Sequence, residues 1–126
     1  MKMGTFTVKL KVWNPADPVR DVEFELWVDT GAAYSWISRA RLEPLGIRAS
    51  QRRQFRTIEG RLIERELAPV FISVDGFISG DNVVMGEPGD MEVLGAFSLA
   101  GLGVVADVVQ KKLAPTTLLA LVVRIR

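Results

Sequence analysis

The sequence predicts an all-β fold, mainly antiparallel, with one or two short helices. Two stretches, 6–12 and 22–28, place an apolar side chain at every second residue, which is the period of a half-buried strand. The rest of the chain consists of short apolar runs separated by turn-forming residues, with no long run at helical spacing. The chain has 126 residues, 48% of them hydrophobic, so we expect one compact domain over residues 1–126.

The first third of the chain predicts a hairpin followed by a short helix. The turn sequence Asn14-Pro15-Ala16-Asp17-Pro18 separates residues 6–12 from residues 22–28, so these two strands are expected to pair antiparallel. The elements expected next are a strand at Trp36-Ile37, an N-cap at Ser38, a helix through Leu42 and a helix end at Leu45-Gly46.

A long polar hairpin is expected in the middle of the chain, over residues 52–67. The turn Glu59-Gly60 lies at its centre, and β-forming residues such as Phe55 and Ile63 flank this turn. The remaining expected elements are a strand at 69–74, a turn at Asp75-Gly76, strands at 77–85 and 91–96, a helix at 97–102 ending at Gly103, a hairpin of 104–107 with 112–115, and a terminal strand at 118–125.

The composition excludes several classes of function. The chain contains no cysteine and no histidine, so it has no disulfide, no thiolate nucleophile and none of the usual imidazole bases or metal ligands. Ser-His-Asp hydrolases, cysteine proteases and typical zinc enzymes are therefore excluded, and we expect neither a metal nor an organic cofactor. Acid-base chemistry has to come from carboxylates, lysines or the single tyrosine, Tyr34.

Charge and hydropathy argue against nucleic-acid and membrane partners. The formal net charge is +1, which provides no strong electrostatic attraction to nucleic acid. No stretch reaches the roughly 18 uninterrupted apolar residues that a transmembrane helix needs. The first residues, MKMGTFTVKLKVW, alternate in polarity and lack the apolar core of a signal peptide. We expect a cytoplasmic location.

The stretch FELWVDTGAAYSWIS, residues 24–38, places a carboxylate at the end of an apolar strand. Burying a carboxylate costs free energy unless it has a partner or a function. One explanation of Asp29 is an Asx-turn, in which the side chain bonds its own backbone. A weak internal repeat is also present. Trp27-Val28-Asp29-Thr30-Gly31-Ala32 is followed by Leu45-Gly46-Ile47, and Glu92-Val93-Leu94-Gly95-Ala96 is followed by Leu102-Gly103-Val104. A strand, glycine, helix and Leu-Gly unit used twice would suit a pseudo-symmetric β-domain.

Three segments in this order resemble the retroviral-type (retropepsin-like) aspartic proteases, and in particular their small cellular members in bacteria and archaea. They are Val28-Asp29-Thr30-Gly31-Ala32, the polar hairpin with Gly60 at its tip, and Val93-Leu94-Gly95 before a short helix; the resemblance extends from about Phe6 to Pro115. It implies a single-lobe subunit with a closed, barrel-like acid-protease fold. It also implies an aspartic endopeptidase that acts as a homodimer, because two carboxylates must share one proton and each subunit supplies only one Asp29.

The resemblance also assigns roles to the neighbours of Asp29. Gly31 is expected to adopt backbone angles closed to other residues and to bring an N–H to the carboxylate. Thr30 is expected to bond across the twofold axis to the partner, and Ala32 to keep the cleft shallow. In the retroviral family the chain termini form much of the dimer interface, so the strands at 6–12 and 118–125 are expected there.

The hairpin is expected to be the flap, with Ile58, Glu59 and Gly60 at its tip, closing over an extended peptide or an unfolded protein substrate. The charged arginines and glutamates of this hairpin either select acidic or polar peptides or form a solvated surface with weak ion pairs. Trp13, Trp27 and Trp36 either line a substrate pocket or pack within the domain.

Two departures from the retroviral pattern keep a second function open. Ala96 occupies the position where retroviral enzymes carry an arginine that ties the dimer together, and the flap tip is charged where theirs is apolar and glycine-rich. The alternative to a peptidase is therefore a catalytically inactive retropepsin-like module that dimerises or binds peptides.

Overall fold

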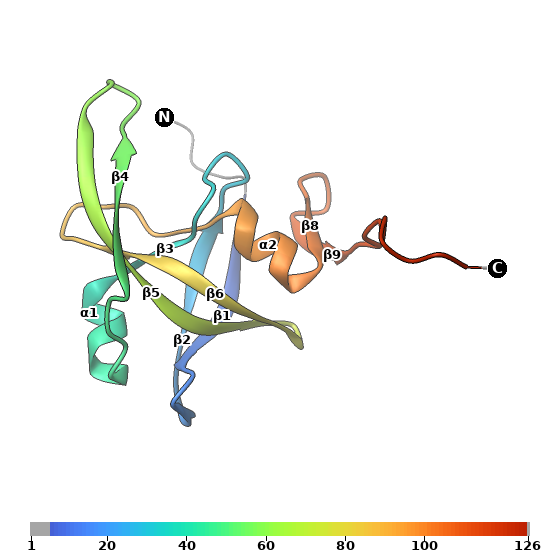
Figure 1. Ribbon diagram of the computed structural model, residues 1–126, viewed down its shortest axis with the longest axis horizontal. Helices are drawn as coiled ribbons and strands as arrows, with labels where there is room; N and C mark the ends of the chain where they lie inside the picture. Colours follow the sequence, from blue (N-terminus) through green and yellow to red (C-terminus); the bar gives the residue numbers. More distant parts are fainter. Residues whose placement is uncertain (1–5, 126) are drawn as a thin grey trace.

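The computed structural model describes residues 6–125 and confirms the all-β prediction. Seven strands form one sheet in the order β1-β2-β7-β3-β6-β5-β4, and an additional pairing of β1 with β5 closes this sheet into a barrel (Figure 1). The strands of this sheet are β1 (Thr7–Asn14), β2 (Asp17–Val28), β3 (Trp36–Ser38), β4 (Gln51–Arg56), β5 (Leu62–Val74), β6 (Phe77–Gly86) and β7 (Val93–Leu94). Most pairs are antiparallel, but β2–β7 and β3–β6 are parallel.

The first two strands form the predicted hairpin. They pair antiparallel from Thr7 opposite Trp27 to Asn14 opposite Asp17, with a turn of two residues that is shorter than expected. Their alternate side chains Leu10, Val12 and Leu26 are almost completely buried in the barrel core. Each such side chain stabilises the fold by roughly 1.5–3 kcal/mol relative to an exposed one, which is why the period of two was informative here.

The predicted short helix consists of α1 (Arg39–Leu42) and a 3-10 turn, η1 (Glu43–Leu45). It ends at Gly46, whose φ of 75° is left-handed and therefore favours glycine. Ser38 is the N-cap residue, as predicted, but its hydroxyl makes no capping bond, and its backbone N–H donates to a carboxylate oxygen of Glu92 at 2.9 Å.

The polar hairpin and the strand expected at 69–74 share one continuous strand, β5, which corrects the sequence prediction of two separate strands. The first half of β5 pairs with β4, and its second half pairs with β6 and β1. Pro69 lies between the residues that pair with β4 and those that pair with β1. A residue without an N–H is tolerated there because β5 has no partner on that side at this point.

The two halves of the weak internal repeat lie side by side. β2 and β7 pair in parallel, with Val28 opposite Leu94, and α2 (Ala96–Leu102) begins directly after Gly95. The helix ends at Gly103, as predicted, where φ is again 75°. Leu99 and Leu102 of α2 are buried against the barrel, so this helix forms part of the core.

The last elements are the predicted hairpin of β8 (Val104–Asp107) and β9 (Lys112–Pro115), which form a separate two-stranded sheet. The strand predicted at 118–125 is wrong: this segment is not a strand and extends away from the body (Figure 1). Its run of apolar and β-forming residues was insufficient because no described segment lies beside it to provide hydrogen bonds. Among residues 6–125, no helix is both long and apolar enough to cross a membrane.

Candidate active site

Asp29 lies where β2 leaves the barrel, next to β7. The N–H of Val28 donates to the carbonyl of Phe6 and the N–H of Asp29 to that of Leu94, both at 3.0 Å. The backbone of Asp29 is therefore held by both neighbouring segments, while its side chain is only half-buried. The parallel pairing of β2 with β7 is the feature that places a carboxylate at this end of the barrel.

The turn after Asp29 orients the carboxylate. The N–H of Gly31 donates to Oδ1 of Asp29 at 2.9 Å, and the N–H of Ala32 donates to the backbone carbonyl of Asp29 at 3.2 Å. The Asx-turn therefore exists, but it occupies only one carboxylate oxygen: within residues 6–125 no hydrogen bond reaches Oδ2. An Asx-turn and an available carboxylate are thus compatible.

Gly31 has a different role from the one predicted. Its φ is not in the left-handed region, so its backbone angles are open to other residues. A Cβ at this position would lie 3.2 Å from Oδ1 of Asp29, which is closer than most real contacts. Glycine is favoured here because it lets the N–H approach the carboxylate without a side chain in the way. This agrees with the prediction that Gly31 brings an N–H to the carboxylate of Asp29.

The start of α2 holds the other end of this turn. The N–H of Ala96 donates to the carbonyl of Ala32 at 2.7 Å, and the N–H of Phe97 donates to the carbonyl of Ala33 at 2.9 Å. Gly95 makes this approach possible, since a Cβ there would lie 2.7 Å from the carbonyl oxygen of Ala32. The first free N–H groups of the helix are thus used to fix the loop that carries Asp29.

A cavity of about 310 Å³ lies beside Asp29. Its lining is mostly apolar and comes from five parts of the chain: Asp29, Ala32, Trp36, Thr57, Ile63, Asp90, Met91 and Val93. Of the predicted site residues, the cavity brings together Asp29 and Ala32. Thr30 and Gly31 do not line it, and Thr30 contributes instead to a separate apolar groove beside α2 and β8.

The two carboxylates of the cavity differ in their surroundings. Asp90 accepts hydrogen bonds from Arg65 at 2.7 and 2.9 Å and from the N–H of Glu87 at 2.7 Å. The Arg65 guanidinium lowers the pKa of Asp90 below its usual range, so Asp90 is fixed as a charged partner of β5. Asp29, in contrast, has no ion pair within residues 6–125.

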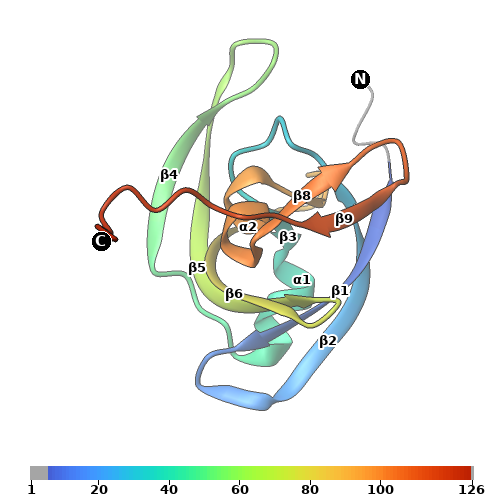
Figure 2. The ribbon, with the colours of Figure 1, turned by 90° about the vertical axis from the view of Figure 1, so that its right-hand side faces the viewer.

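The hairpin of β4 and β5 stands at the same end of the molecule as the loop after β2 (Figures 1 and 2). Thr57 and Ile63 of this hairpin line the cavity, whereas the predicted residues Ile58, Glu59 and Gly60 lie at the exposed tip beyond it. Gly60 has a φ of 89°, and its carbonyl accepts a hydrogen bond from Arg56 at 2.9 Å. The tip is therefore internally braced, with the large side chain of Ile58 79% exposed.

Aromatic side chains connect the hairpin, near its tip, to the loop that carries Asp29. Phe55 of β4 contacts Trp36, with ring centroids 5.2 Å apart, and Tyr34 at 6.0 Å. Trp36 is thus the tryptophan that lines the cavity, while Trp13 packs on Phe71 elsewhere. Sequence reasoning missed Thr57, Ile63, Asp90 and Met91 as lining residues because only the closed barrel brings them to Asp29.

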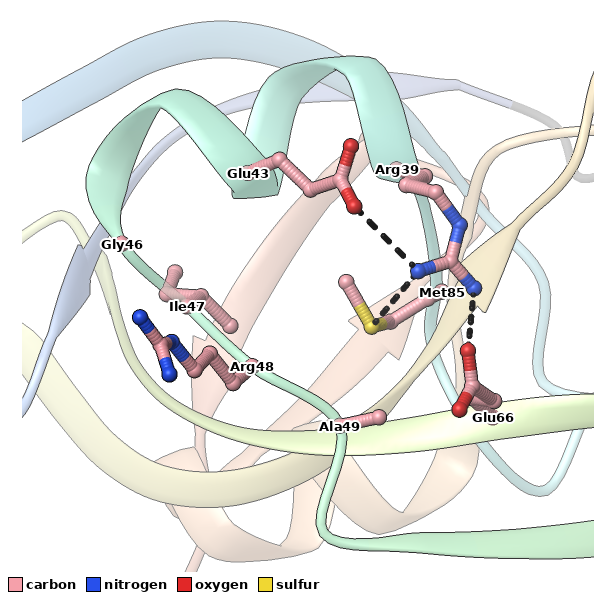
Figure 3. A pocket seen from close by; sticks show the side chains of 8 residues that line it. All are labelled: Arg39, Glu43, Gly46, Ile47, Arg48, Ala49, Glu66 and Met85. Carbon is pink, nitrogen blue, oxygen red and sulfur yellow. Dashed lines mark hydrogen bonds and ion pairs between the residues drawn. The ribbon is translucent and has the colours of Figure 1, made fainter.

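A second cavity, of about 430 Å³, lies beside α1 at the opposite end from the hairpin tip (Figures 1 and 3). Arg39 projects into it and bonds Glu43, Glu66 and Glu87. The hydrogen bond to Glu87, with support from Glu66, raises the pKa of Arg39. This charge cluster ties α1 to β5 and to the loop after β6. Within residues 6–125 no group of three or more potential metal ligands occurs.

The fold is similar to that of a known protease. The solution structure of Simian Foamy Virus (mac) protease superposes with a TM-score of 0.54 and 18% sequence identity, covering 75% of this chain and 91% of that chain. The chain has a retropepsin-like fold. No family model and no curated protein matches the sequence. The likeness establishes the fold, and the closed single-lobe barrel predicted from the sequence is confirmed.

Proposed function

We propose that this chain is an aspartic endopeptidase that acts as a homodimer and hydrolyses peptide bonds with a water activated by Asp29 from each subunit. The observation that carries the proposal is the geometry of Asp29 in a retropepsin-like fold. One of its carboxylate oxygens is fixed by Gly31, the other accepts no hydrogen bond within residues 6–125, and an apolar cavity lined in part by the β4–β5 hairpin lies beside it.

The chemistry requires a second carboxylate. One carboxylate takes a proton from water while the other, protonated, polarises the scissile carbonyl, and a single Asp29 cannot do both. A twofold axis next to the loop would bring in the second copy. Thr30 supports this arrangement because it is exposed beside Asp29, and within residues 6–125 its hydroxyl has no hydrogen-bond partner.

Exposed apolar side chains near Thr30 support a dimer interface built from the C-terminal part of the chain. An apolar groove of about 430 Å³ runs along α2 and β8 from Thr30 to Leu118. The tail beyond the groove exposes large apolar side chains: Leu118, Leu119, Leu121, Val122, Val123 and Ile125. Such a surface is unfavourable in water and favours burial against a partner.

The N-terminal strand contributes less to this interface than the sequence suggested. β1 pairs with β2 along its whole length, and residues 11–13 also pair with β5 on the other side. Those residues therefore have no free edge for a partner strand. The proposed interface accordingly rests on the β8–β9 sheet and the tail.

The cavity indicates which substrates fit. An extended peptide would lie under the hairpin and place an apolar side chain between Trp36, Met91 and Val93, since the charge of Asp90 is already neutralised by Arg65. The proposal needs neither a metal nor an organic cofactor. That this chain belongs with the small prokaryotic members of the retropepsin-like family, and that it is cytoplasmic, stay predictions.

The decisive experiment is cleavage of an unfolded, broadly sampled peptide mixture from about pH 3 to pH 8, because a dyad that shares a proton works where one carboxylate is protonated. Asp29→Asn is compared with Asp21→Asn, which changes an exposed aspartate of the same strand. We expect activity in the parent and the control but not in Asp29→Asn. Full activity of Asp29→Asn would refute the proposal.

The alternative is the inactive dimerisation or peptide-binding module. The charged, braced tip and Ala96 favour it, because both differ from the retroviral pattern. In that case the parent would be a folded dimer that cuts no peptide, and it would bind extended peptides with an affinity that Asp29→Asn does not change. The mass in solution separates both functions from a strict monomer, which could perform neither.

A further inference from the structure

A buried polar network connects the loop of Asp29 to α2 and to β6. It contains Ser35 at the end of this loop, Ser98 of α2 and Asp81 of β6; both serines are completely buried. The hydroxyls of Ser35 and Ser98 lie 2.5 Å apart, and the hydroxyl of Ser98 donates to Oδ2 of Asp81. The N–H of Gly95 donates to the hydroxyl of Ser35 at 2.9 Å.

The direction of every hydrogen bond in this network follows from counting hydrogens. A serine hydroxyl has one hydrogen to donate. Ser98 gives its hydrogen to Asp81, so the hydrogen between the two serines belongs to Ser35. Ser35 in turn accepts from Gly95. The chain of donors thus runs from Gly95 through both hydroxyls and ends on the carboxylate of Asp81, where the negative charge fixes its direction.

The network holds both supports of Asp29. Ser35 closes the loop that begins at Asp29, and its carbonyl accepts the N–H of Val84 at 2.9 Å. Gly95 directly follows Leu94, whose carbonyl accepts the N–H of Asp29. Because these backbone connections are rigid, a displacement of Ser35 or Gly95 would also displace Asp29.

We propose that Asp81 is a positioning residue for the catalytic carboxylate: through Ser98 and Ser35 it fixes Gly95 and the loop, and so the orientation of Asp29. The catalytic part of this inference rests on the proposed function. The positional part, in which Asp81 fixes the position of Gly95, does not depend on the proposed function.

The surroundings of Asp81 favour this positioning role over the alternative, in which Asp81 only satisfies the hydrogen bonding of two buried hydroxyls. Burial raises the pKa of Asp81, although the Ser98 hydroxyl and the N–H of Asn82 oppose the shift. Its other surroundings are a cavity lined by prolines, Val70, Phe71 and Gly80, with no charged side chain besides its own. An asparagine would accept from Ser98 without the cost of burying a charge. A carboxylate fixes the direction of the hydrogen bonds in the network and forms a stronger hydrogen bond with Ser98, but its burial lowers the stability of the fold.

The test compares Asp81→Ala, Asp81→Asn and the exposed control Asp21→Ala, all in the full chain. The first readout is hydrogen exchange of the Gly95 amide, followed by NMR. We expect exchange in Asp81→Ala to be faster by about tenfold or more, since loss of the acceptor frees Ser98 and then Ser35. We expect Asp81→Asn, which keeps an acceptor oxygen, to lie between this variant and the parent. An unchanged Gly95 amide in Asp81→Ala would overturn the inference.

The second readout is peptide cleavage. We expect kcat of Asp81→Ala to fall by about tenfold with KM nearly unchanged, because the carboxylate is misaligned while the cavity is intact. Asp81→Asn should recover most of kcat and shift the pH profile. A kcat equal to that of the parent, despite faster Gly95 exchange, would overturn the catalytic role. If the parent cuts nothing, the proposed function fails, and the exchange experiment still decides the positional part. Should Asp81→Ala not fold, Ser98→Ala with the same two readouts replaces it.

Discussion

Replacing Gly95 with alanine tests whether the close contact between α2 and the loop that carries Asp29 holds the candidate site together. The backbone of Gly95 is extended, with φ of −99° and ψ of −178°, so any residue can adopt these angles. The cost of the substitution is therefore purely steric. The new Cβ would lie 2.6 Å from the carbonyl carbon of Tyr34 and 2.7 Å from the carbonyl oxygen of Ala32, and both are backbone atoms that cannot rotate away.

The magnitude follows from two contributions. Overpacking of this kind costs about 1–3 kcal/mol. The forced separation also weakens the hydrogen bonds from Ala96 to Ala32 and from Phe97 to Ala33, each contributing about 1 kcal/mol. The sum is roughly 3–5 kcal/mol, a large share of the about 5–15 kcal/mol that stabilises a typical domain. For a chain of this length the melting temperature should fall by roughly 10–20 °C.

The assay is thermal unfolding followed by circular dichroism at one fixed protein concentration, because a dimer melts at a concentration-dependent temperature. The matched control is Gly101→Ala in the same helix, where the new Cβ meets the hydroxyl of Ser79, which can rotate away, and lies 3.2 Å from the Cβ of Ser79, a milder contact than those at Gly95. Alanine also favours a helix interior by about 0.5–1 kcal/mol over glycine. The control should therefore melt within a few degrees of the parent, and equal melting temperatures for both variants would refute the reasoning.

Three further predictions address the interface, the cavity and the ion pair beside it. Deleting the residues after Thr117 should raise the dimer dissociation constant measured by analytical ultracentrifugation, because the tail offers the largest exposed apolar surface; an unchanged constant would exclude it from the interface. Met91→Ala enlarges the cavity and should shift cleavage sites, mapped by mass spectrometry, toward larger apolar side chains; identical sites would show that no substrate side chain enters there. Asp90→Asn should destabilise the protein more at pH 7 than at about pH 2, because the folded-state pKa of Asp90 lies below its unfolded value and its contribution is lost as pH falls through the folded pKa. Urea unfolding at both pH values checks this, and an equal loss at both would contradict it.

Local interactions determined the parts of the structure that the sequence predicted well. The N-terminal hairpin, the turn at Gly60 and the helix ends at Gly46 and Gly103 depend on alternation of polarity and on glycine at left-handed positions. Both are visible in a short window of residues. The position of Asp29 after an apolar strand belongs to the same class, which is why the candidate site could be found from the sequence.

Contacts between distant residues decided the rest. The closure of the barrel by β1 and β5, the parallel pairing of β2 with β7 and the joining of Asp81, Ser98 and Ser35 connect residues that lie 17–66 positions apart. No local pattern encodes such a contact, since a serine or an aspartate looks the same in sequence whether it faces solvent or a buried partner. The tail shows the converse: residues 118–125 are rich in apolar and β-forming residues but lack a partner within the described chain, and a strand forms only where a second backbone completes its hydrogen bonds.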